Sequence, residues 1–328
     1  MSNRTNSVRP KELFDKVCRQ RELDGKSFHS DYHDRFTATP CPACGSEGVD
    51  VFKKYGFTFQ ECPECLTIYC SPRPDDELLK MYYAHYDAPK LWTDILMASN
   101  TQRAKKHYAP RVQKIIGALD GHGEGGVAVD LGAGNGTFAQ HLAASRYFSN
   151  VICLDWCERC VDECLQKGLK SLQGGLELLG DGCAQLICLN DVIEHLFDPG
   201  DVLRQCWRVL EKGGYVSIAA PNGRGFDQLV LGKETANVVP PEHLTFFNPA
   251  AMRILFKQCG FEVVDISTPG RLDVAIVADE VDKGFALGEG GLFIETIIHS
   301  EQSVRDSFQT FLSSHGLSGH MLCIGRKK

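Results

Sequence analysis

The sequence has no apolar run that approaches the ~20 residues of a membrane-spanning helix, so no membrane span is expected. Positive charge is not in excess either: 35 Lys and Arg against 42 Asp and Glu give a net charge of −7. Such a chain offers no field that attracts nucleic acid or an anionic membrane. The polar stretch Met1–Pro10 lacks the apolar core of a signal peptide. These absences favour a cytoplasmic protein and make nucleic acid an unexpected partner.

Cysteine is abundant, with fifteen residues. Because nothing near the N-terminus suggests secretion, we expect these thiols in a reducing compartment, where metal binding or burial is more common than a disulfide framework. The length of 328 residues allows one large domain and a small one. The oligomeric state stays open at this level.

Four of the cysteines form two Cys-x-x-Cys pairs, Cys41/Cys44 and Cys62/Cys65, with seventeen residues between the pairs. This spacing is typical of a structural zinc site with four thiolate ligands. The strand-like residues Val49 to Phe59 between the pairs would bring the two knuckles together as a zinc ribbon. Four thiolates close the tetrahedron, so the metal would stabilise structure and leave no open position for chemistry. The alternative is four free cysteines in a small loop region.

An apolar run ending in Asp130 is followed by three glycines at alternate positions and then by the helix-compatible run Phe138 to Ala144. This order predicts a buried strand, a tight turn and a helix, the arrangement in which an α/β sheet presents a ligand to the carboxyl ends of its strands. A dinucleotide loop needs Gly-x-Gly-x-x-Gly, but Gly136 comes one residue early. Asp130 would also repel a pyrophosphate. Both features disfavour a nicotinamide oxidoreductase.

The stretch from Asp130 to Gly136 resembles the first motif, Asp-Leu-Gly-x-Gly-x-Gly, of the class I S-adenosylmethionine-dependent methyltransferases. Glu194-His195-Leu196 and the Gly213-Gly214 pair resemble later motifs, so the resemblance covers about residues 126 to 260. Apolar strands alternating with helices also predict a parallel, doubly wound sheet. We therefore expect an α/β fold: a doubly wound, seven-stranded, Rossmann-like methyltransferase sheet with a small N-terminal zinc ribbon.

Asp155 follows an apolar run nineteen residues after Gly136, close to the ~20-residue offset at which an acid binds ribose hydroxyls. The resemblance implies S-adenosylmethionine as the donor and S-adenosylhomocysteine as the product. It also implies a set of donor contacts: Asp130 near the ammonium, Gly132, Ala133, Gly134 and Gly136 in the loop, Asp155 at the ribose, Trp156 over the adenine, and the backbone carbonyl of Asn190 beside the methyl group. Tyr86 is a further candidate for the donor carboxylate. Core packing is the alternative for Tyr86 and Trp156.

An acceptor hydroxyl or acidic carbon needs a base, and histidine has a suitable pKa near neutrality. His195 and His243 both fall where loops at the carboxyl ends of strands should gather. His243 lies in His-Leu-Thr-Phe-Phe, which resembles an acceptor-pocket segment of small-molecule methyltransferases. His243 is the preferred base, and a hydrogen-bonded structural histidine is the alternative for each.

The chain divides into an N-terminal extension (residues 1–36), the zinc ribbon (37–72), a helical lead covering the active site (73–120) and the methyltransferase domain (121–328). Residues Lys11 to Leu23 are compatible with a short amphipathic helix, and a loosely docked or partly disordered lead is the alternative. Gly121 to Gly126 predict a flexible turn. Arg271 to Lys283 and Glu295 to Leu312 predict an added strand and helix, before a final antiparallel strand, His320 to Gly325.

The favoured function is methyl transfer to a small-molecule acceptor, a hydroxyl or activated carbon of a sugar or secondary metabolite, for example. One alternative is an RNA methyltransferase that uses the ribbon as reader. Another is a non-catalytic S-adenosylmethionine-binding module. The acidic balance disfavours the first, and the intact Asp130, Asp155 and glycines disfavour lost cofactor binding.

Overall fold

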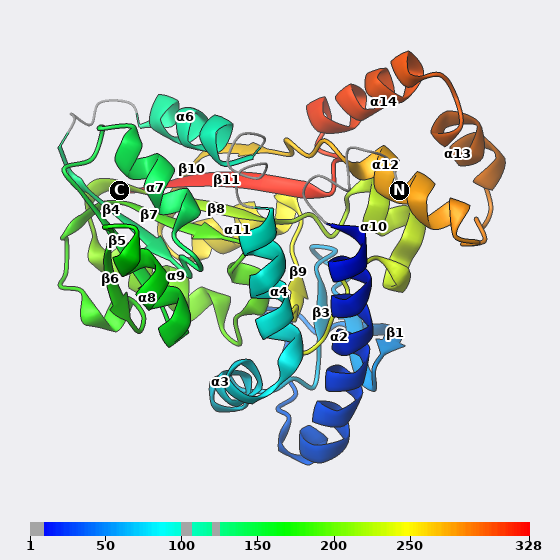
Figure 1. Cartoon of the computed structure of the whole chain (residues 1–328), viewed down its shortest axis with the longest axis horizontal. Helices are drawn as coiled ribbons and strands as arrows, with labels where there is room; N and C mark the ends of the chain where they lie inside the picture. The colour runs from blue at the N-terminus through cyan, green and yellow to red at the C-terminus, as the bar shows by residue number, and fades with distance from the viewer. Residues whose placement is uncertain (1–9, 100–106, 120–124) are drawn as a thin grey trace.

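The computed structural model describes residues 10–99, 107–119 and 125–328. The turn expected at Gly121 to Gly126 therefore lies mostly outside the described residues, as do the first nine residues of the polar N-terminus. A central sheet fills one half of the molecule, and the N-terminal helices and a smaller sheet lie beside it (Figure 1).

The central sheet has seven strands in the order β10-β11-β8-β7-β4-β5-β6. Parallel pairing joins β8, β7, β4, β5 and β6, whereas β11 runs antiparallel between β8 and β10. The strands are β4 (Val127–Leu131), β5 (Asn150–Asp155), β6 (Lys170–Gln173), β7 (Ala184–Asn190), β8 (Leu210–Pro221), β10 (Phe261–Ser267) and β11 (His320–Lys327). The expected seven-stranded, doubly wound sheet with an antiparallel last strand is confirmed.

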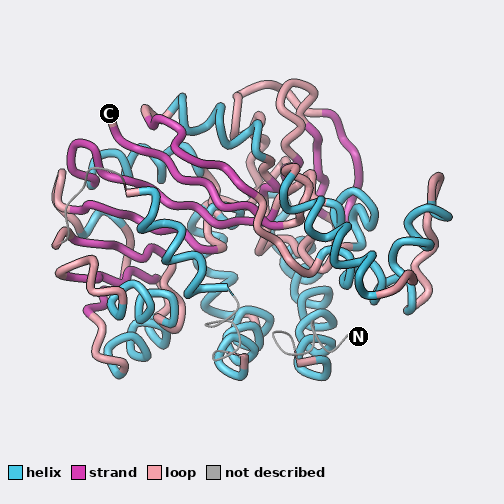
Figure 2. Tube along the Cα trace, turned by 90° about the horizontal axis from the view of Figure 1, so that it is seen from above, coloured by secondary structure: helices cyan, strands magenta, loops and turns pink. Residues whose placement is uncertain are grey.

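Two hydrophobic clusters cover the two faces of this sheet. The side chains of β7 alternate between them. Leu186 and Cys188 point into one cluster, and Ile187 and Leu189 into the other, as the two-residue period of a strand requires. Helices cover both faces (Figure 2). One face packs against α6 (Ala109–Ala118), α7 (Thr137–Ala144) and α8 (Glu158–Gln166), and the other against α9 (Pro199–Val209) and α11 (Pro249–Gln258).

The smaller sheet contains β1 (Val49–Lys54), β2 (Phe57–Glu61), β3 (Ile68–Cys70) and β9 (Thr245–Phe246), all antiparallel. Its last strand comes from a segment far along the chain, because Tyr69 pairs with Thr245. Cys41, Cys62 and Cys65 also belong to the hydrophobic cluster that lies under α9 and α11. The ribbon is thus built into the main body through both backbone pairing and core packing.

The N-terminal helix α2 (Lys11–Tyr32) is longer than the predicted Lys11 to Leu23. Its buried residues recur every three or four positions, and the last of them, Phe28, packs beyond the predicted end among aromatic side chains of the ribbon and of α3 (Asp76–His85). Asp75 caps α3 by accepting a hydrogen bond from the backbone N–H of Leu78 at 2.9 Å. Helix α4 (Asp87–Ala98) then packs along α2.

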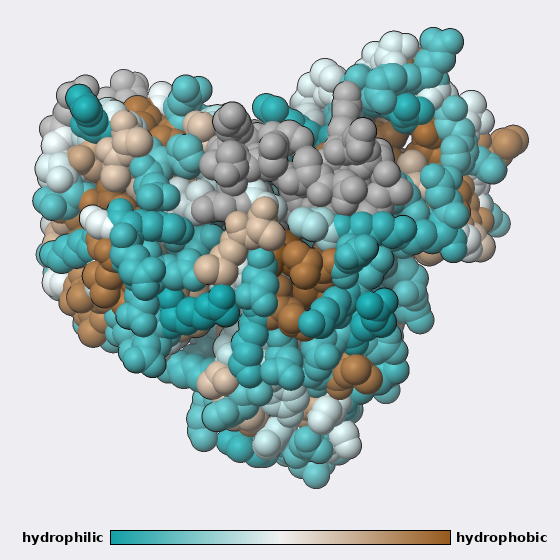
Figure 3. All heavy atoms as spheres, in the orientation of Figure 1, coloured by the Kyte–Doolittle hydropathy of each residue, from teal (hydrophilic) through white to brown (hydrophobic). Residues whose placement is uncertain are grey.

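The strand expected within Arg271 to Lys283 is wrong. The segment between β10 and β11 contains three helices, α12 (Asp273–Asp282), α13 (Gly291–Ile298) and α14 (Gln302–Ser314). They enclose a small core of their own with α10 (Phe226–Leu231), and they project from the main body at the end of the molecule opposite β6 (Figure 1). Figure 3 shows hydrophobic atoms at the surface around α13, where Leu292 and Phe293 are 78% and 62% exposed.

No helix among the described residues is long and apolar enough to cross a bilayer.

Candidate active site

The candidate site lies at the carboxyl ends of the parallel strands. Strand β4 ends at Leu131, the glycine loop follows, and α7 begins at Thr137. Asp155 ends β5 and Asn190 ends β7. Because β11 runs antiparallel, its first residue reaches the same edge, where His320 lies opposite Pro221. The predicted loop and acids are therefore gathered at one edge of the sheet.

The three glycines of the loop all have positive φ, which glycine adopts at little cost, but their surroundings differ. A Cβ on Gly132 would lie 2.5 Å from Val192 Cγ2, and one on Gly136 would lie 2.7 Å from Cys164 Sγ. A Cβ on Gly134 would meet no atom of the described residues within 4 Å. Gly132 and Gly136 thus let the loop pack against the protein, and Gly134 leaves room on the side where a ligand would approach.

Asp155 is held in place by two backbone donors. Its Oδ2 accepts from Gly134 N at 2.8 Å, and its Oδ1 accepts from Cys157 N at 2.9 Å. Each carboxylate oxygen keeps lone-pair capacity for one more donor, such as one of two adjacent ribose hydroxyls. Burial raises the pKa of this carboxyl, and the backbone donors oppose that rise. Asp155 therefore offers free acceptor capacity at the carboxyl end of β5.

Trp156 does not pack in the core: its side chain is 54% exposed. The ammonium of Lys80, on α3, lies 3.9 Å from the centre of the indole ring, a cation–π contact. The alternative of ordinary core packing is therefore wrong for this residue, and one face of the ring remains a candidate cover for the adenine.

Asp130 is 2% exposed, and its Oδ2 has no hydrogen-bond partner among the described residues. Its Oδ1 accepts a long hydrogen bond of 3.4 Å from Asn190 Nδ2. Burial raises the pKa of Asp130 to about 7. A buried carboxyl with an unpartnered oxygen is unfavourable by itself, which fits a site completed by a cationic ligand group such as an ammonium.

Arg111, near the start of α6, extends this network. Its Nη1 donates to Asn190 Oδ1 at 2.7 Å, so the side chain of Asn190 bridges Arg111 and Asp130. The sequence predicted Asn190 only for its backbone carbonyl, and it did not indicate Arg111, which lies ahead of the glycine loop in no recognisable motif. The open side of Gly134, the free Oδ2 of Asp130 and the lone pairs of Asp155 together fit the methionine and ribose parts of S-adenosylmethionine.

Tyr86 lies elsewhere. Its ring packs against Phe28 at 5.6 Å and Tyr82 at 4.9 Å, within the aromatic cluster beneath α2. We therefore remove Tyr86 from the expected donor contacts, because its ring is taken up by packing.

His195 and His243 are brought together from two segments, with ring centres 4.7 Å apart and planes at 81°. His243 Nδ1 lies 2.7 Å from the backbone carbonyl of Asn237, which makes Nδ1 the protonated nitrogen and leaves Nε2 with a lone pair. His195 Nδ1 lies 2.8 Å from the hydroxyl of Tyr83, on α3. Burial is the main cause that lowers the pKa of both imidazoles, so both are uncharged near neutrality.

Two further side chains at this edge were not predicted. Glu194, in the single turn η4 (Ile193–His195), is 1% exposed, and neither carboxylate oxygen has a hydrogen-bond partner among the described residues. His320 Nε2 lies 2.9 Å from Asp191 Oδ1. Glu194 was visible in the sequence only as part of the Glu-His-Leu motif, and His320 only as the start of a strand.

The four ribbon cysteines converge as their spacing predicts. Cys41 and Cys65 have Sγ atoms 3.5 Å apart, and Cys44 and Cys62 have Sγ atoms 3.4 Å apart. All four thiols lie within 4.8 Å of one another. Bonds of about 2.3 Å to a tetrahedral zinc ion would place the sulfurs about 3.8 Å apart. The donor set and its spacing therefore fit zinc.

Comparisons with known proteins agree with this geometry. A family described as "Methyltransferase domain" matches residues 99–266, slightly more than half of the chain. A Mycolicibacterium smegmatis protein described as a "probable S-adenosylmethionine-dependent methyltransferase" is 33% identical over 87 residues, which are 26% of this chain and 32% of that protein. The chain thus matches about a third of the length of this curated relative.

Solved structures are similar at lower identity. A SAM-dependent methyltransferase from Archaeoglobus fulgidus is 18% identical, with 67% of this chain and 92% of that chain covered and a TM-score of 0.46. A phosphoethanolamine N-methyltransferase from Haemonchus contortus is 15% identical, with 66% and 52% covered and a TM-score of 0.47. Since the family match spans more than half of the sequence, the chain belongs to the family described as "Methyltransferase domain".

Proposed function

We propose that this protein transfers a methyl group from S-adenosylmethionine to a small-molecule acceptor, through a hydroxyl or an activated carbon, and releases S-adenosylhomocysteine. The observation that supports an acceptor of this kind is the pair of uncharged imidazoles, His195 and His243, at the same sheet edge as the glycine loop. An acceptor that must lose a proton needs such a group beside it.

The donor side would be held by the residues around the glycine loop. Asp155 would accept from the ribose hydroxyls, and the unpartnered oxygen of Asp130 would face the ammonium. Arg111 would hold the side chain of Asn190 in position. When bound, the donor supplies an electrophilic methyl group on sulfur. The contribution of the protein is to hold donor and acceptor in line, which removes much of the entropic part of the barrier.

The acceptor side would be formed by the two histidines and covered by the N-terminal helices. Tyr83 of α3 contacts His195, and Arg21 of α2 forms a buried bidentate ion pair with Glu242, next to His243. Since the Nδ1 of His243 is engaged by Asn237, Nε2 is the atom that would act on the proton of the acceptor. If the described helices of residues 73–99 and 107–119 cover the site, as the contact of Tyr83 with His195 supports, a small acceptor is favoured over a macromolecule.

Donor binding can be tested with the substitution Asp155→Asn, which keeps the shape of the side chain and removes its charge. We expect calorimetry to show that the wild type binds S-adenosylhomocysteine and that the variant binds it about 100-fold more weakly, because hydrogen bonds to a charged group contribute about 1.5–3 kcal/mol each. Asp162→Asn, at an exposed position on α8, is the charge-matched control. Absence of binding to the wild type would refute the proposed function.

The class of acceptor can be tested with a donor carrying a labelled methyl group. The enzyme is incubated with cell extract divided into a small-molecule filtrate, an RNA fraction and a protein fraction. We expect label in the small-molecule filtrate. Label found only in the RNA or protein fraction would refute the small-molecule acceptor. The proposed binding of S-adenosylmethionine would still stand.

We also propose that Cys41, Cys44, Cys62 and Cys65 bind one structural zinc ion, and that the protein is cytoplasmic. None of the fifteen cysteines, all of which are among the described residues, forms a disulfide, which agrees with a reducing compartment. In Cys62→Ser, metal analysis should show about one zinc ion fewer per chain than in the wild type, and the melting temperature should fall because metal binding contributes folding free energy. Cys183→Ser, at an exposed thiol, should leave both unchanged. Equal zinc content in the wild type and Cys62→Ser would exclude the site.

A further inference from the structure

The carboxyl group of Glu194 is buried in the acceptor region without a partner. Its side chain is 1% exposed, and both oxygens lack a hydrogen bond among the described residues. An isolated ionised carboxylate in a protein interior is unfavourable by several kcal/mol, so such a group carries a proton or faces a cation. Burial accordingly raises the pKa of Glu194 well above its ordinary value.

Two imidazoles lie beside this carboxylate. A ring nitrogen of His195, a ring nitrogen of His243 and a carboxylate oxygen of Glu194 all lie within 4.8 Å of one another. Ligand atoms around an ion with bonds of about 2.0–2.2 Å lie about 3–4 Å apart, so a small inward rotation of the side chains would complete the set. Two histidines and one carboxylate are a common ligand set for divalent transition-metal ions.

The hydrogen bonds around the cluster also suit a metal. His243 donates its Nδ1–H to the carbonyl of Asn237, and a metal-ligating histidine usually anchors its second nitrogen in this way. The backbone N–H of Leu244 donates to the carbonyl of Glu194 at 2.8 Å, which ties the two segments together directly. The three candidate ligands therefore keep a fixed relative position.

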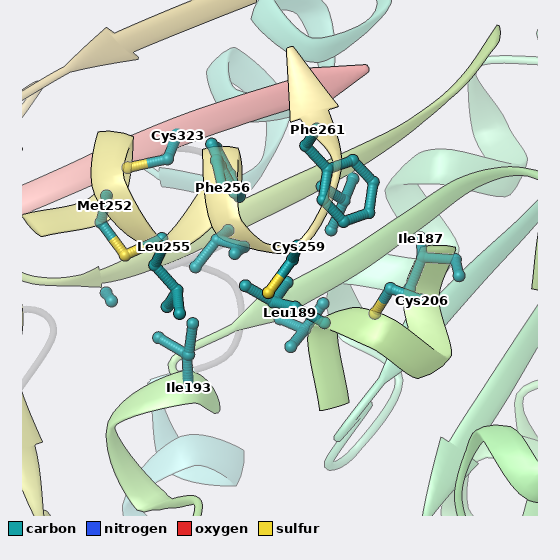
Figure 4. Packing of buried hydrophobic residues seen from close by; sticks show 14 of the residues in the cluster. Ile187, Leu189, Ile193, Cys206, Met252, Leu255, Phe256, Cys259, Phe261 and Cys323 are labelled. Atoms are coloured by element: carbon teal, nitrogen blue, oxygen red, sulfur yellow. The ribbon is translucent and has the colours of Figure 1, made fainter. Parts of the chain in front are cut away.

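Both segments are also anchored in the interior. Ile193 precedes Glu194 and points from η4 toward Leu255 in the core (Figure 4). Glu242 precedes His243 and forms the buried ion pair with Arg21. Rigid backbone on either side is what holds a ligand set in place before the ion arrives.

We propose that Glu194, His195 and His243 form a second metal site, which holds a divalent first-row transition-metal ion beside the acceptor. Three protein ligands leave coordination positions open, and an acceptor oxygen is the ligand that would fill one of them. An oxygen bound to such an ion loses its proton more readily, since the charge of the ion stabilises the oxyanion. In this arrangement the lone pair of His243 Nε2 binds the ion, so His243 acts as a ligand in place of the direct base, and the acceptor proton passes to solvent water. This use of the ion rests on the proposed function, whereas the binding of the ion does not.

The test uses Mn²⁺ alone, because thiolate ligands such as those of the ribbon have little preference for this ion. The full-length protein is treated with a mild chelator, its ribbon zinc content is checked, and Mn²⁺ binding is measured by electron paramagnetic resonance. We expect one Mn²⁺ per chain in the wild type and at least tenfold weaker binding in Glu194→Gln, an isosteric change that leaves a neutral side chain in the buried position. Glu177→Gln, at an exposed carboxylate outside the cluster, is the matched control.

Two outcomes would overturn the proposal: no Mn²⁺ binding to the wild type, or equal binding by the wild type and Glu194→Gln. Binding of S-adenosylhomocysteine is measured on the same samples and should be unchanged in Glu194→Gln. Loss of donor binding in the wild type, with Mn²⁺ binding intact, would refute the proposed function and leave the metal site standing. Once an acceptor is identified, chelation should abolish methyl transfer and Mn²⁺ should restore it.

Discussion

Asp130 is the residue whose protonation should report donor binding. Its pKa of about 7 in the free protein results mainly from burial, so near pH 7 about half of the molecules carry a neutral Asp130. An ammonium beside its free oxygen would favour the charged form and lower that pKa. Binding should therefore release a proton, most clearly at pH 6 to 7 and less at pH 8, where the group is already ionised.

This release can be measured by calorimetry of S-adenosylhomocysteine binding at pH 6.5 in buffers with different ionisation enthalpies. We expect the observed enthalpy to depend on the buffer in the wild type and to lose most of that dependence in Asp130→Asn. A buffer-independent enthalpy in the wild type would place the ammonium away from Asp130.

At the residue scale, the sequence predicted the side chains that belong to a motif. Asp130, Asp155 and the glycines could be named because their spacing is fixed by one strand–loop–helix–strand unit, from β4 to the end of β5. Arg111 and Tyr83 could not, because each reaches the site from a separate helix, and only the packed structure shows which helix lies there. Tyr86 was misassigned for the same reason: it joins α3 to α4, and its ring packs in the aromatic cluster.

At the scale of elements, α2 is joined to the loop that carries His243. Arg21 donates to both oxygens of Glu242, at 3.1 and 2.6 Å, and the guanidinium also lies 4.7 Å from the ring of Trp92 on α4. The ion pair is almost fully buried. One contact thus joins the N-terminal helices, which come early in the chain, to a loop near residue 240.

Breaking this pair should destabilise the protein. Arg21→Met leaves Glu242 buried and unpaired, and removal of one partner of a buried ion pair destabilises by about 3–5 kcal/mol. Urea unfolding should show that loss, and Arg21→Met/Glu242→Gln should recover a large part of it because no uncompensated charge remains. Lys26→Met is the control. Among the described residues Lys26 forms an exposed ion pair with Glu22, so its loss should change stability by less than about 0.5 kcal/mol. An Arg21→Met loss no larger than that of the control would contradict the argument.

Most helices and strands could be predicted because the spacing of their hydrophobic residues can be read within the element itself. For the segment Arg271 to Lys283 this spacing led to the wrong prediction of a strand. Its Val274, Ile276 and Val277 are β-branched residues that favour a strand. In the structure Val274 and Val277 are buried one helical turn apart, in a small core shared with residues of α10 and α14. Because that core is assembled from segments distant in the chain, the sequence of residues 271–283 alone does not indicate it.

At the scale of the molecule, the net charge favours a small-molecule acceptor over a nucleic acid. A protein with a charge of −7 has no overall field that would attract a polyanion. We expect the protein to pass through a heparin column at about 150 mM salt, and tRNA to leave its migration in a native gel unchanged. Retention on heparin at that salt concentration would restore the RNA alternative, because it would reveal a basic patch that the net charge conceals.

The pairing of β3 with β9 has a consequence for how the protein is made. Thr245 is synthesised 176 residues after Tyr69, its partner. At about 5–20 residues per second, the ribosome needs roughly 9–35 s to supply it. During that interval the cysteine knuckles can already close around a metal, since their contacts are local, while one edge of β3 remains open to other chains. A zinc ion bound at this stage would stabilise the ribbon before β9 is available. Metal shortage during synthesis would therefore lead to aggregation more readily than metal loss from the folded protein.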